Sequence, residues 1–293
     1  MELNKEEITT PPRPAATVVL LRDGDAGLEV LMIRRAAQSD VLGGAYVFPG
    51  GKLDAADSDI AVTQRIDALA DDLHLALGEP NLDTTTAAAL FVAAARETFE
   101  ECGILMAHGV GQQGVELALQ RAQEGRNFAQ IIDELQLRIR TSGLVPWTRW
   151  ITPRMAAVMT KRFDTRFFVA EVPEGATAQH DDHEATEAVW LQPRAALERY
   201  LNREIQLAPP QIQSLAHLAR HTRAADVVAE AAKRLPPLIE PESFEEDGKR
   251  ILVYPGDPKH SVPVRAMPGP TRLVHSKGLF LPEAGFEALF GQG

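Results

Sequence analysis

The sequence has 293 residues, 45% of them hydrophobic and 24% charged, which is the composition of an ordinary globular protein and argues against large-scale disorder. Its formal net charge of −11 argues against nonspecific binding to nucleic acid or to an anionic membrane. The single cysteine, Cys102, excludes an internal disulfide and cysteine-rich zinc modules. We therefore expect neither a nucleic-acid partner nor a membrane partner.

Both ends of the sequence favour a cytoplasmic location. Residues 1–13 are polar and acidic, and we expect them to form an N-terminal tail. The first apolar run, residues 15–21, is too short to span a bilayer or to serve as the core of a signal peptide. The sequence ends in Phe-Gly-Gln-Gly, which is neither a peroxisomal address nor a prenylation signal.

Residues 14–235 are expected to form one domain that begins with a β-hairpin. Residues 15–21 and 28–34 are rich in β-branched and aliphatic side chains, and they flank the turn-forming sequence DGDAG. A further short strand over residues 45–48 runs into Pro49-Gly50-Gly51. Proline ends the strand, and two glycines allow the loop to approach a ligand closely.

Helical patterns and strand signals follow along the rest of this domain. Capping candidates Thr84–Thr86 and a stop at Gly103 frame the second predicted helix. A pair of inserted helices is expected within about 112–140. The predicted helices cover residues 60–77, 87–102, 115–125, 127–140, 193–202 and 209–234, and the predicted strands cover 150–159, 166–172 and 187–191.

The last part of the chain, residues 236–293, is rich in proline and has short extended pieces in place of helices. It contains too little apolar material for a core of its own. We therefore expect an extended C-terminal arm that packs on the body or on a second subunit, which is compatible with a homodimer.

Three carboxylates fall on one face of the helix predicted over 87–102. At 100° per residue, Glu97, Glu100 and Glu101 share a patch about 100° wide, opposite an apolar face. One interpretation is a solvated acidic face on which Arg96 pairs with Glu100. The other is a site for Mg²⁺ or Mn²⁺, because these ions prefer carboxylate oxygen and a helix fixes the separation of its ligands.

The residues around these carboxylates resemble the Nudix box. That pattern is glycine, five residues, glutamate, seven residues, Arg-Glu, an aliphatic, any residue, Glu-Glu, any residue, glycine and an aliphatic. Its second half is present as RETFEECGI, residues 96–104. Its first half departs from the pattern, since Asp57 stands where the glutamate is expected after Gly51, and an insertion over roughly 58–88 delays the helix.

An interrupted box of this kind resembles the branch that contains the peroxisomal coenzyme A diphosphatases. The phrases YVFPGG and AARETFEECGIL carry this resemblance, and TPRM at 152–155 and RFDTRFF at 162–168 add to it. The resemblance covers about residues 14–222.

The resemblance implies an α/β (α+β) fold of the Nudix type, a mixed β-sheet sandwiched between helices, here with helical insertions and a C-terminal arm. It implies that Glu97, Glu100 and Glu101 bind metal and that Arg96, Glu100 and Glu101 act in catalysis. It also implies that Arg96 orients the acidic cluster and that Gly50 and Gly51 shape the loop at the site.

Other polar residues remain open in function. The family often adds a distant acidic ligand or base, and the candidates here are Asp181, Asp182, Glu184 and Glu187. His180 and His183 are better explained as part of a polar loop than as a second metal site, because no third ligand follows at a recognisable spacing. Cys102 is expected to be a small buried hydrophobe. Trp147 and Trp150 could stack on a base or pack in the core.

A basic stretch offers the positive charge that an anionic substrate needs in this acidic protein. It contains Arg149, Arg154, Lys161, Arg162 and Arg166 against Asp164 alone. A solvated basic loop is the simpler interpretation of the stretch. As substrate-binding residues we predict Arg34, Arg154 and Arg162, together with Gly50 and Gly51.

The predicted function is divalent-metal-dependent hydrolysis of a diphosphate linkage in a small anionic, nucleotide-like metabolite. By resemblance, coenzyme A or an acyl-coenzyme A is the leading substrate. A nucleoside-diphosphate sugar or a dinucleotide is the alternative within the same chemistry. The alternative of another class is a non-catalytic Nudix module that binds a nucleotide metabolite.

Overall fold

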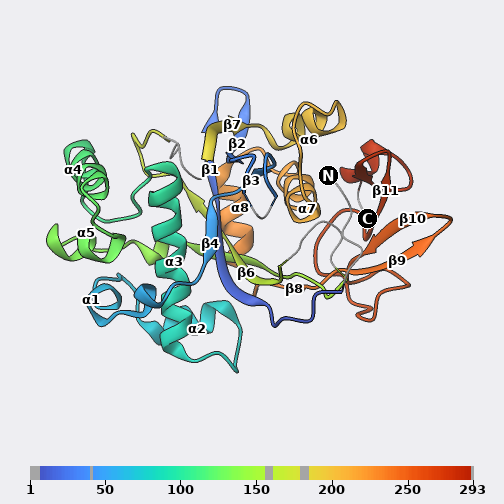
Figure 1. Ribbon diagram of the computed structural model, residues 1–293. Coiled ribbons are helices and arrows are strands. Elements are labelled where there is room, and N and C mark those ends of the chain that lie inside the picture. The colour runs from blue at the N-terminus through green and yellow to red at the C-terminus, as the bar shows by residue number, and fades with distance from the viewer. Residues whose placement is uncertain (1–6, 40–41, 156–160, 179–184, 292–293) are drawn as a thin grey trace.

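The centre of the protein is a mixed sheet. The computed structural model describes residues 7–39, 42–155, 161–178 and 185–291 (Figure 1). Within these residues, eight strands form the main sheet in the order β3-β2-β1-β6-β5-β8, with β4 paired to β1 and β7 paired to β2. β1 is parallel to β6 and β5 is parallel to β8, and the other described pairs of this sheet are antiparallel. The strands are β1 (Arg13–Gly24), β2 (Gly27–Arg35), β3 (Tyr46–Val47), β4 (Gly50–Lys52), β5 (Val145–Ile151), β6 (Phe163–Glu171), β7 (Ala185–Leu191) and β8 (Leu238–Ile239).

Helices cover both faces of this sheet, as the alternation along β1 shows. Val18 and Leu20 lie in a buried cluster with the apolar residues of α3 (Thr84–Cys102), whereas Val19 and Leu21 lie in a second cluster with those of α6, α7 and α8. These three helices are α6 (Pro193–Leu201), α7 (Pro209–Leu218) and α8 (Ala224–Ala231). The expected fold class, a mixed sheet sandwiched between helices, is confirmed.

Helix α3 has well-defined ends. The side chain of Asp83 accepts a hydrogen bond from the backbone N–H of Thr86 at 2.8 Å, so Asp83 is the N-cap, and the expected candidates Thr84–Thr86 lie inside the first turn. Gly103 ends the helix in a left-handed conformation with φ 66°, as predicted. None of the helices that the structure describes is both long and apolar enough to cross a membrane.

The insertion contains two short helices in place of the single helix predicted over 60–77. They are α1 (Ile60–Thr63) and α2 (Ala70–Leu77), preceded by the short helix η1 (Ala55–Ser58). The chain bends between them, where Ile66 bridges to Ile139. Leu73 and Leu77 of α2 are buried in one cluster with α3, whereas Leu69, just before α2, is 72% exposed.

Other boundaries also differ from the predicted ones. The strand expected over 150–159 is β5, which ends at Ile151. The helix expected over 209–234 is divided into α7 and α8, and α8 begins where the side chain of Asp23 accepts a hydrogen bond from Ala224 N at 2.7 Å. The inserted helical pair is present as α4 (Gln112–Gln123) and α5 (Phe128–Glu134), followed by the short helix η2 (Thr141–Gly143).

The C-terminal region is folded and is not an extended arm. After β8 it forms a second antiparallel sheet in the order β12-β11-β10-β9 among the described residues, seen as orange and red ribbon at one end of Figure 1. Leu252, Tyr254 and Phe280 belong to the same buried cluster as α6–α8, so this region completes the core of the body. Its elements are β9 (Glu242–Glu246), β10 (Lys249–Val253), β11 (Arg272–Ser276), β12 (Leu279–Leu281) and η3 (Phe286–Leu289).

A buried ion-pair network ties the end of the insertion to the sheet. Glu79 lies 2.8 Å from Arg149 Nη1 and 2.5 Å from Arg166 Nη2. Asp164 pairs with the same two arginines, at 2.7 Å and 3.1 Å. The side chains of Glu79 and Arg166 are 9% and 4% exposed, so these charges are poorly solvated and depend on one another.

We predict that Glu79→Gln lowers the free energy of unfolding by about 3 kcal/mol, because it leaves the buried guanidinium of Arg166 and the partly buried one of Arg149 with a single carboxylate. Urea denaturation monitored by circular dichroism measures this value. The matched control is Glu116→Gln on the exposed surface of α4, which we expect to change stability little. Equal stability of the two variants would contradict a structural role for Glu79.

Candidate active site

The glycine loop lies directly against the carboxylate face of α3. β4 pairs with β1, and this pairing holds Gly50 N where it donates a hydrogen bond to Glu101 Oε2 at 2.7 Å. Gly50 has φ +155°, and a Cβ there would collide with the backbone of Thr17 at 2.7 Å. The loop therefore requires glycine at this position.

Gly51 is required for a different reason, which is the position of Glu97. A Cβ on Gly51 would lie 2.6 Å from Cδ and 2.8 Å from Oε2 of Glu97. The carboxylate of Glu97 therefore occupies the space that a side chain at residue 51 would need, and it rests on the loop backbone. The loop thus brings Glu97 and Glu101, which are 8% and 4% exposed, to one place at the edge of the sheet.

Arg96 lies at the centre of the acidic cluster. Its Nη1 donates to Glu97 Oε1 at 2.8 Å and to Glu100 Oε2 at 2.9 Å. Its Nε and Nη2 donate to the two carboxylate oxygens of Asp57 at 2.7 and 3.0 Å. Burial opposes the charge on Arg96, but the hydrogen bond to Asp57 and the charges of Glu97, Asp57 and Glu100 outweigh it and raise its pKa.

The cluster fits a hard divalent cation. The ligand atoms of Glu97, Glu100 and Glu101 are all carboxylate oxygens on one rigid helix, which is the donor type that Mg²⁺ and similar ions prefer. Glu97 and Glu101 are already placed by the loop. Glu100 is more exposed and turned toward Arg96, so its side chain must rotate to join them around an ion.

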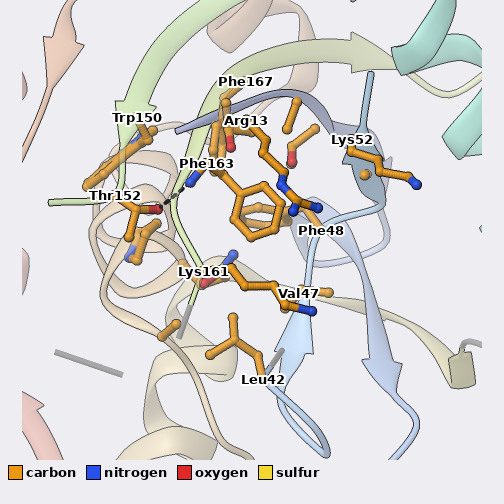
Figure 2. A pocket seen from close by; sticks show the side chains of 18 of the residues that line it. Arg13, Leu42, Val47, Phe48, Lys52, Trp150, Thr152, Lys161, Phe163 and Phe167 are labelled. Atoms are coloured by element: carbon orange, nitrogen blue, oxygen red, sulfur yellow. Dashed lines mark hydrogen bonds between the residues drawn. The ribbon is translucent and has the colours of Figure 1, made fainter. Parts of the chain in front are cut away.

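A cavity of about 710 Å³ opens beside the carboxylates. Arg13, Arg35, Lys52 and Lys161 line it together with the acidic cluster. Figure 2 shows the side chains of Arg13 and Lys161 pointing into the cavity, with Lys52 on the far side from Trp150. The cavity is thus lined by charges of both signs, which suits an anion that is held partly by metal and partly by cationic side chains.

The other part of the cavity wall is apolar. Trp150, Phe163 and Phe167 come from β5 and β6, and Leu252 comes from the C-terminal sheet. Figure 2 shows Phe163 near the middle of the cavity, where its backbone N–H donates to Thr152 Oγ1 at 3.2 Å. The cavity therefore offers charged groups and an apolar wall to a single ligand.

Comparison with known proteins agrees with this geometry. Residues 10–218 match the family model described as the NUDT19 Nudix domain. The chain belongs to the Nudix hydrolase family. Nudix hydrolases generally use divalent metal ions, which accords with the carboxylate cluster.

Two similar proteins carry the name acyl-coenzyme A diphosphatase NUDT19. The Xenopus laevis protein is 30% identical over 225 residues, which cover 65% of this chain and 59% of that protein. The Homo sapiens protein is 27% identical over 261 residues, which cover 76% of this chain and 67% of that protein. The chain thus matches less than two thirds of the frog protein's length.

A solved structure supports the fold. The crystal structure of a NUDIX hydrolase from Alicyclobacillus acidocaldarius is 27% identical to this chain and superposes with a TM-score of 0.56. The superposition covers 78% of this chain and 99% of the other.

Three arginines predicted to bind substrate lie elsewhere in this Nudix protein. Among the described residues that line the cavity, Arg34, Arg154 and Arg162 are absent. Arg34 is exposed on β2, and Arg154 is exposed near Glu7, at 3.7 Å. Arg162 is buried, and its guanidinium donates to Thr152 O at 2.7 Å and to Glu240 at 3.1 Å. The guanidinium of Arg162 therefore has partners within the protein.

The cavity's cations were missed because they are brought together by strand pairing. Arg13 was assigned to the tail, yet it begins β1 and pairs with Phe163 on β6. Arg35 follows Arg34 in β2, so alternation along the strand directs the two side chains differently. That alternation was the available signal for Arg35, and Lys161 had been noted only as part of the basic stretch.

The proposed distal acid is not identified. Asp181, Asp182 and Glu184, with His180 and His183, fall outside the described residues. Glu187 lies on β7, where its carboxylate accepts a hydrogen bond from the Tyr46 hydroxyl at 2.5 Å. Burial and this bond to Glu187 raise the pKa of Tyr46 to about 12.

Cys102, Trp147 and Trp150 are all buried. Cys102 is fully buried, as expected, and burial raises the pKa of its thiol well above the ordinary value, so it is not a nucleophile. Trp147 packs in the core, whereas Trp150 lines the cavity.

We predict that Gly51→Ala lowers the affinity for the activating metal, because the new methyl group displaces the carboxylate of Glu97. Isothermal titration with Mg²⁺ measures the change. Gly111→Ala is the control, since a Cβ there meets nothing within 4 Å. Equal metal affinity in the two variants would show that the position of Glu97 does not matter.

Proposed function

We propose that the protein hydrolyses a diphosphate linkage in a nucleotide-like metabolite, with coenzyme A or an acyl-coenzyme A as the leading substrate. The observation that carries the proposal is that the Glu97, Glu100 and Glu101 cluster lines the same cavity as several cationic side chains and a group of apolar ones. In this proposal Mg²⁺ or Mn²⁺ binds the three glutamates.

The bound metal would lower the pKa of a water molecule and neutralise charge on the phosphates. The protein's own groups have separate tasks. Glu97 and Glu101 hold their carboxylates in fixed positions against the loop, and Arg96 offsets the repulsion within the cluster. Arg35 lies 3.9 Å from Glu101, and its buried Nε has no hydrogen-bond partner among the described residues, so it is suited to bind a phosphate oxygen.

The two-part cavity supports a substrate that joins a diphosphate to an extended, partly apolar group. Coenzyme A has this form, and its acyl thioesters extend the apolar part. Hydrolysis adds water across the diphosphate and yields a phosphopantetheine and adenosine 3′,5′-bisphosphate. The names of the frog and human relatives point to the same substrate class.

The two alternative functions predict different results in the same hydrolysis assay. A nucleoside-diphosphate sugar or dinucleotide hydrolase would cleave those compounds in preference to coenzyme A when assayed with Mg²⁺ or Mn²⁺. A non-catalytic nucleotide-binding module would bind them and cleave none. A panel of diphosphates assayed with each metal separates the three functions, and failure to cleave any member would overturn the proposal.

We predict that Glu100→Gln and Glu101→Gln each lower turnover by about 10²–10³-fold, a loss typical of removing one stabilising group from an active site. In Glu101→Gln the side-chain amide oxygen can still accept the hydrogen bond from Gly50 N, so the fold should be retained. Steady-state kinetics at saturating Mg²⁺ measure turnover, with Glu116→Gln as the surface control. Near-normal turnover in both active-site variants would show that these glutamates take no part in catalysis.

Lys161 and Arg154 should differ in their contribution to substrate binding. Lys161→Gln should raise the Michaelis constant more than it lowers turnover, because the cavity loses a ground-state contact with the anion. Arg154→Gln should leave both constants near normal, since Arg154 does not line the cavity and its side chain is 67% exposed. Measurements at low ionic strength, where screening is least, give the largest difference. A larger increase of the Michaelis constant in Arg154→Gln than in Lys161→Gln would instead identify Arg154 as the substrate-binding residue.

The cellular setting is part of the proposal. A cytoplasmic location and the possibility of a homodimer remain predictions from the sequence. The net charge of −11 supports a small anionic metabolite, bound by local cations, over a nucleic-acid partner.

A further inference from the structure

A second group of ligand-type side chains lies where α7 leads into α8, with His217 on α7, His221 in the turn between the two helices and Glu230 on α8. Within the residues that the structure describes, His217, His221 and Glu230 form a group whose ligand atoms all lie within 4.8 Å of one another. Nε2 of His217 lies 3.0 Å from one carboxylate oxygen of Glu230, and Nε2 of His221 lies 2.9 Å from the other. None of the three residues lines the cavity beside the glutamate cluster.

We propose that His217, His221 and Glu230 form a second metal site, selective for Zn²⁺ and similar transition-metal ions. His217 lies in the last turn of α7 and His221 in the turn that follows this helix, and the centroids of their rings are 6.0 Å apart. Two imidazole nitrogens and a carboxylate are a common ligand set for zinc, with water as the fourth ligand. Tetrahedral ligands at zinc distances lie about 3.3 Å apart. The distances from Nε2 of the two histidines to the oxygens of Glu230, 3.0 and 2.9 Å, are close to this value, so the side chains need to shift only a little to bind an ion.

Burial fixes the geometry of the site. The side chain of His217 is 2% exposed, and its ring lies against Trp147 with centroids 5.0 Å apart. The side chain of Glu230 is 38% exposed, so an ion can enter from its side.

Two features limit the affinity. Arg234 Nη2 lies 3.6 Å from Glu230, and its positive charge opposes a bound cation. Nδ1 of His217 has no hydrogen-bond partner among the described residues, whereas a ligating histidine usually donates its second N–H to an acceptor. An ion-pair cluster without metal is the competing explanation of the same contacts. Since the side chain of Arg234 is 31% exposed, it can move away from an entering ion.

A metal here would act on the framework of the cavity. His217 lies near the C-terminal end of α7, and Pro209 at the start of the same helix lines the cavity. Joining α7 to α8 would hold that helix in place. The proposal concerns a site distinct from the glutamate cluster and does not depend on the proposed hydrolase activity.

The experiment is titration of the metal-free protein with Co²⁺ in excess Mg²⁺, which occupies oxygen-rich sites. We expect visible absorption of near-tetrahedral Co²⁺ and quenching of Trp147 fluorescence. His221→Ala and Glu230→Gln should each weaken binding by at least about 10-fold, because changes outside the ligand set alone cost 10–100-fold. Arg234→Gln should strengthen it. His221 and Glu230 are partly exposed, so these variants should fold, which circular dichroism checks.

Two controls test the location of the metal. Glu101→Gln and the double variant His180→Ala/His183→Ala should bind Co²⁺ like the unaltered protein. Zn²⁺ should also raise the melting temperature of the unaltered protein but not that of His221→Ala. The proposal is overturned if the unaltered protein gives no Co²⁺ signal, or if the signal survives in His221→Ala and Glu230→Gln. Loss of the signal only in the double variant would assign the metal to the other pair of histidines.

Discussion

The guanidinium of Arg96 is the contact on which the arrangement of the acidic cluster depends. Glu97, Glu100 and Glu101 are close enough on one helix to repel, and two of them are buried. Arg96 pairs with Glu97 and Glu100, while the backbone N–H of Gly50 donates a hydrogen bond to the carboxylate of Glu101. The glycine loop thus holds Glu97 and Glu101 in place before any metal arrives, and Arg96 holds Glu100 beside them.

The same guanidinium explains how the protein accommodates an insertion in the middle of its box. Asp57 lies just before the insertion, is 2% exposed, and binds Arg96 through both oxygens. At the other end, Glu79 is held by Arg149 and Arg166 of the sheet. Because the entropy cost of a longer loop grows slowly with its length, anchoring both ends is sufficient to keep the helix in register. An aspartate, although shorter than the family's glutamate, reaches the arginine from this position.

Features that depend on near neighbours in sequence could be predicted. The carboxylate face of α3, its stop at Gly103 and the burial of Cys102 all follow from helical periodicity and glycine conformation. The mixed sheet between helices was also predicted, through the resemblance of the box to a known family.

Features that depend on distant pairing could not be predicted. Parallel pairing of β1 with β6 brings Arg13 beside Phe163, which are 150 residues apart in sequence. The basic stretch was misleading because Arg149, Arg162 and Arg166 are used in internal ion pairs. The C-terminal region has too little apolar material to fold alone, but it shares the core of α6–α8, and composition does not reveal a shared core.

Leu252 and Pro241 form part of the cavity wall. The cavity wall and the catalytic carboxylates can therefore change independently in evolution. The carboxylates and the glycine loop lie between residues 50 and 101, while part of the apolar wall comes from residues much further along the chain. Sequence change in that later segment can reshape the wall without altering a single carboxylate. A lineage of such proteins could therefore diversify in what it accepts while the reaction itself stays constant.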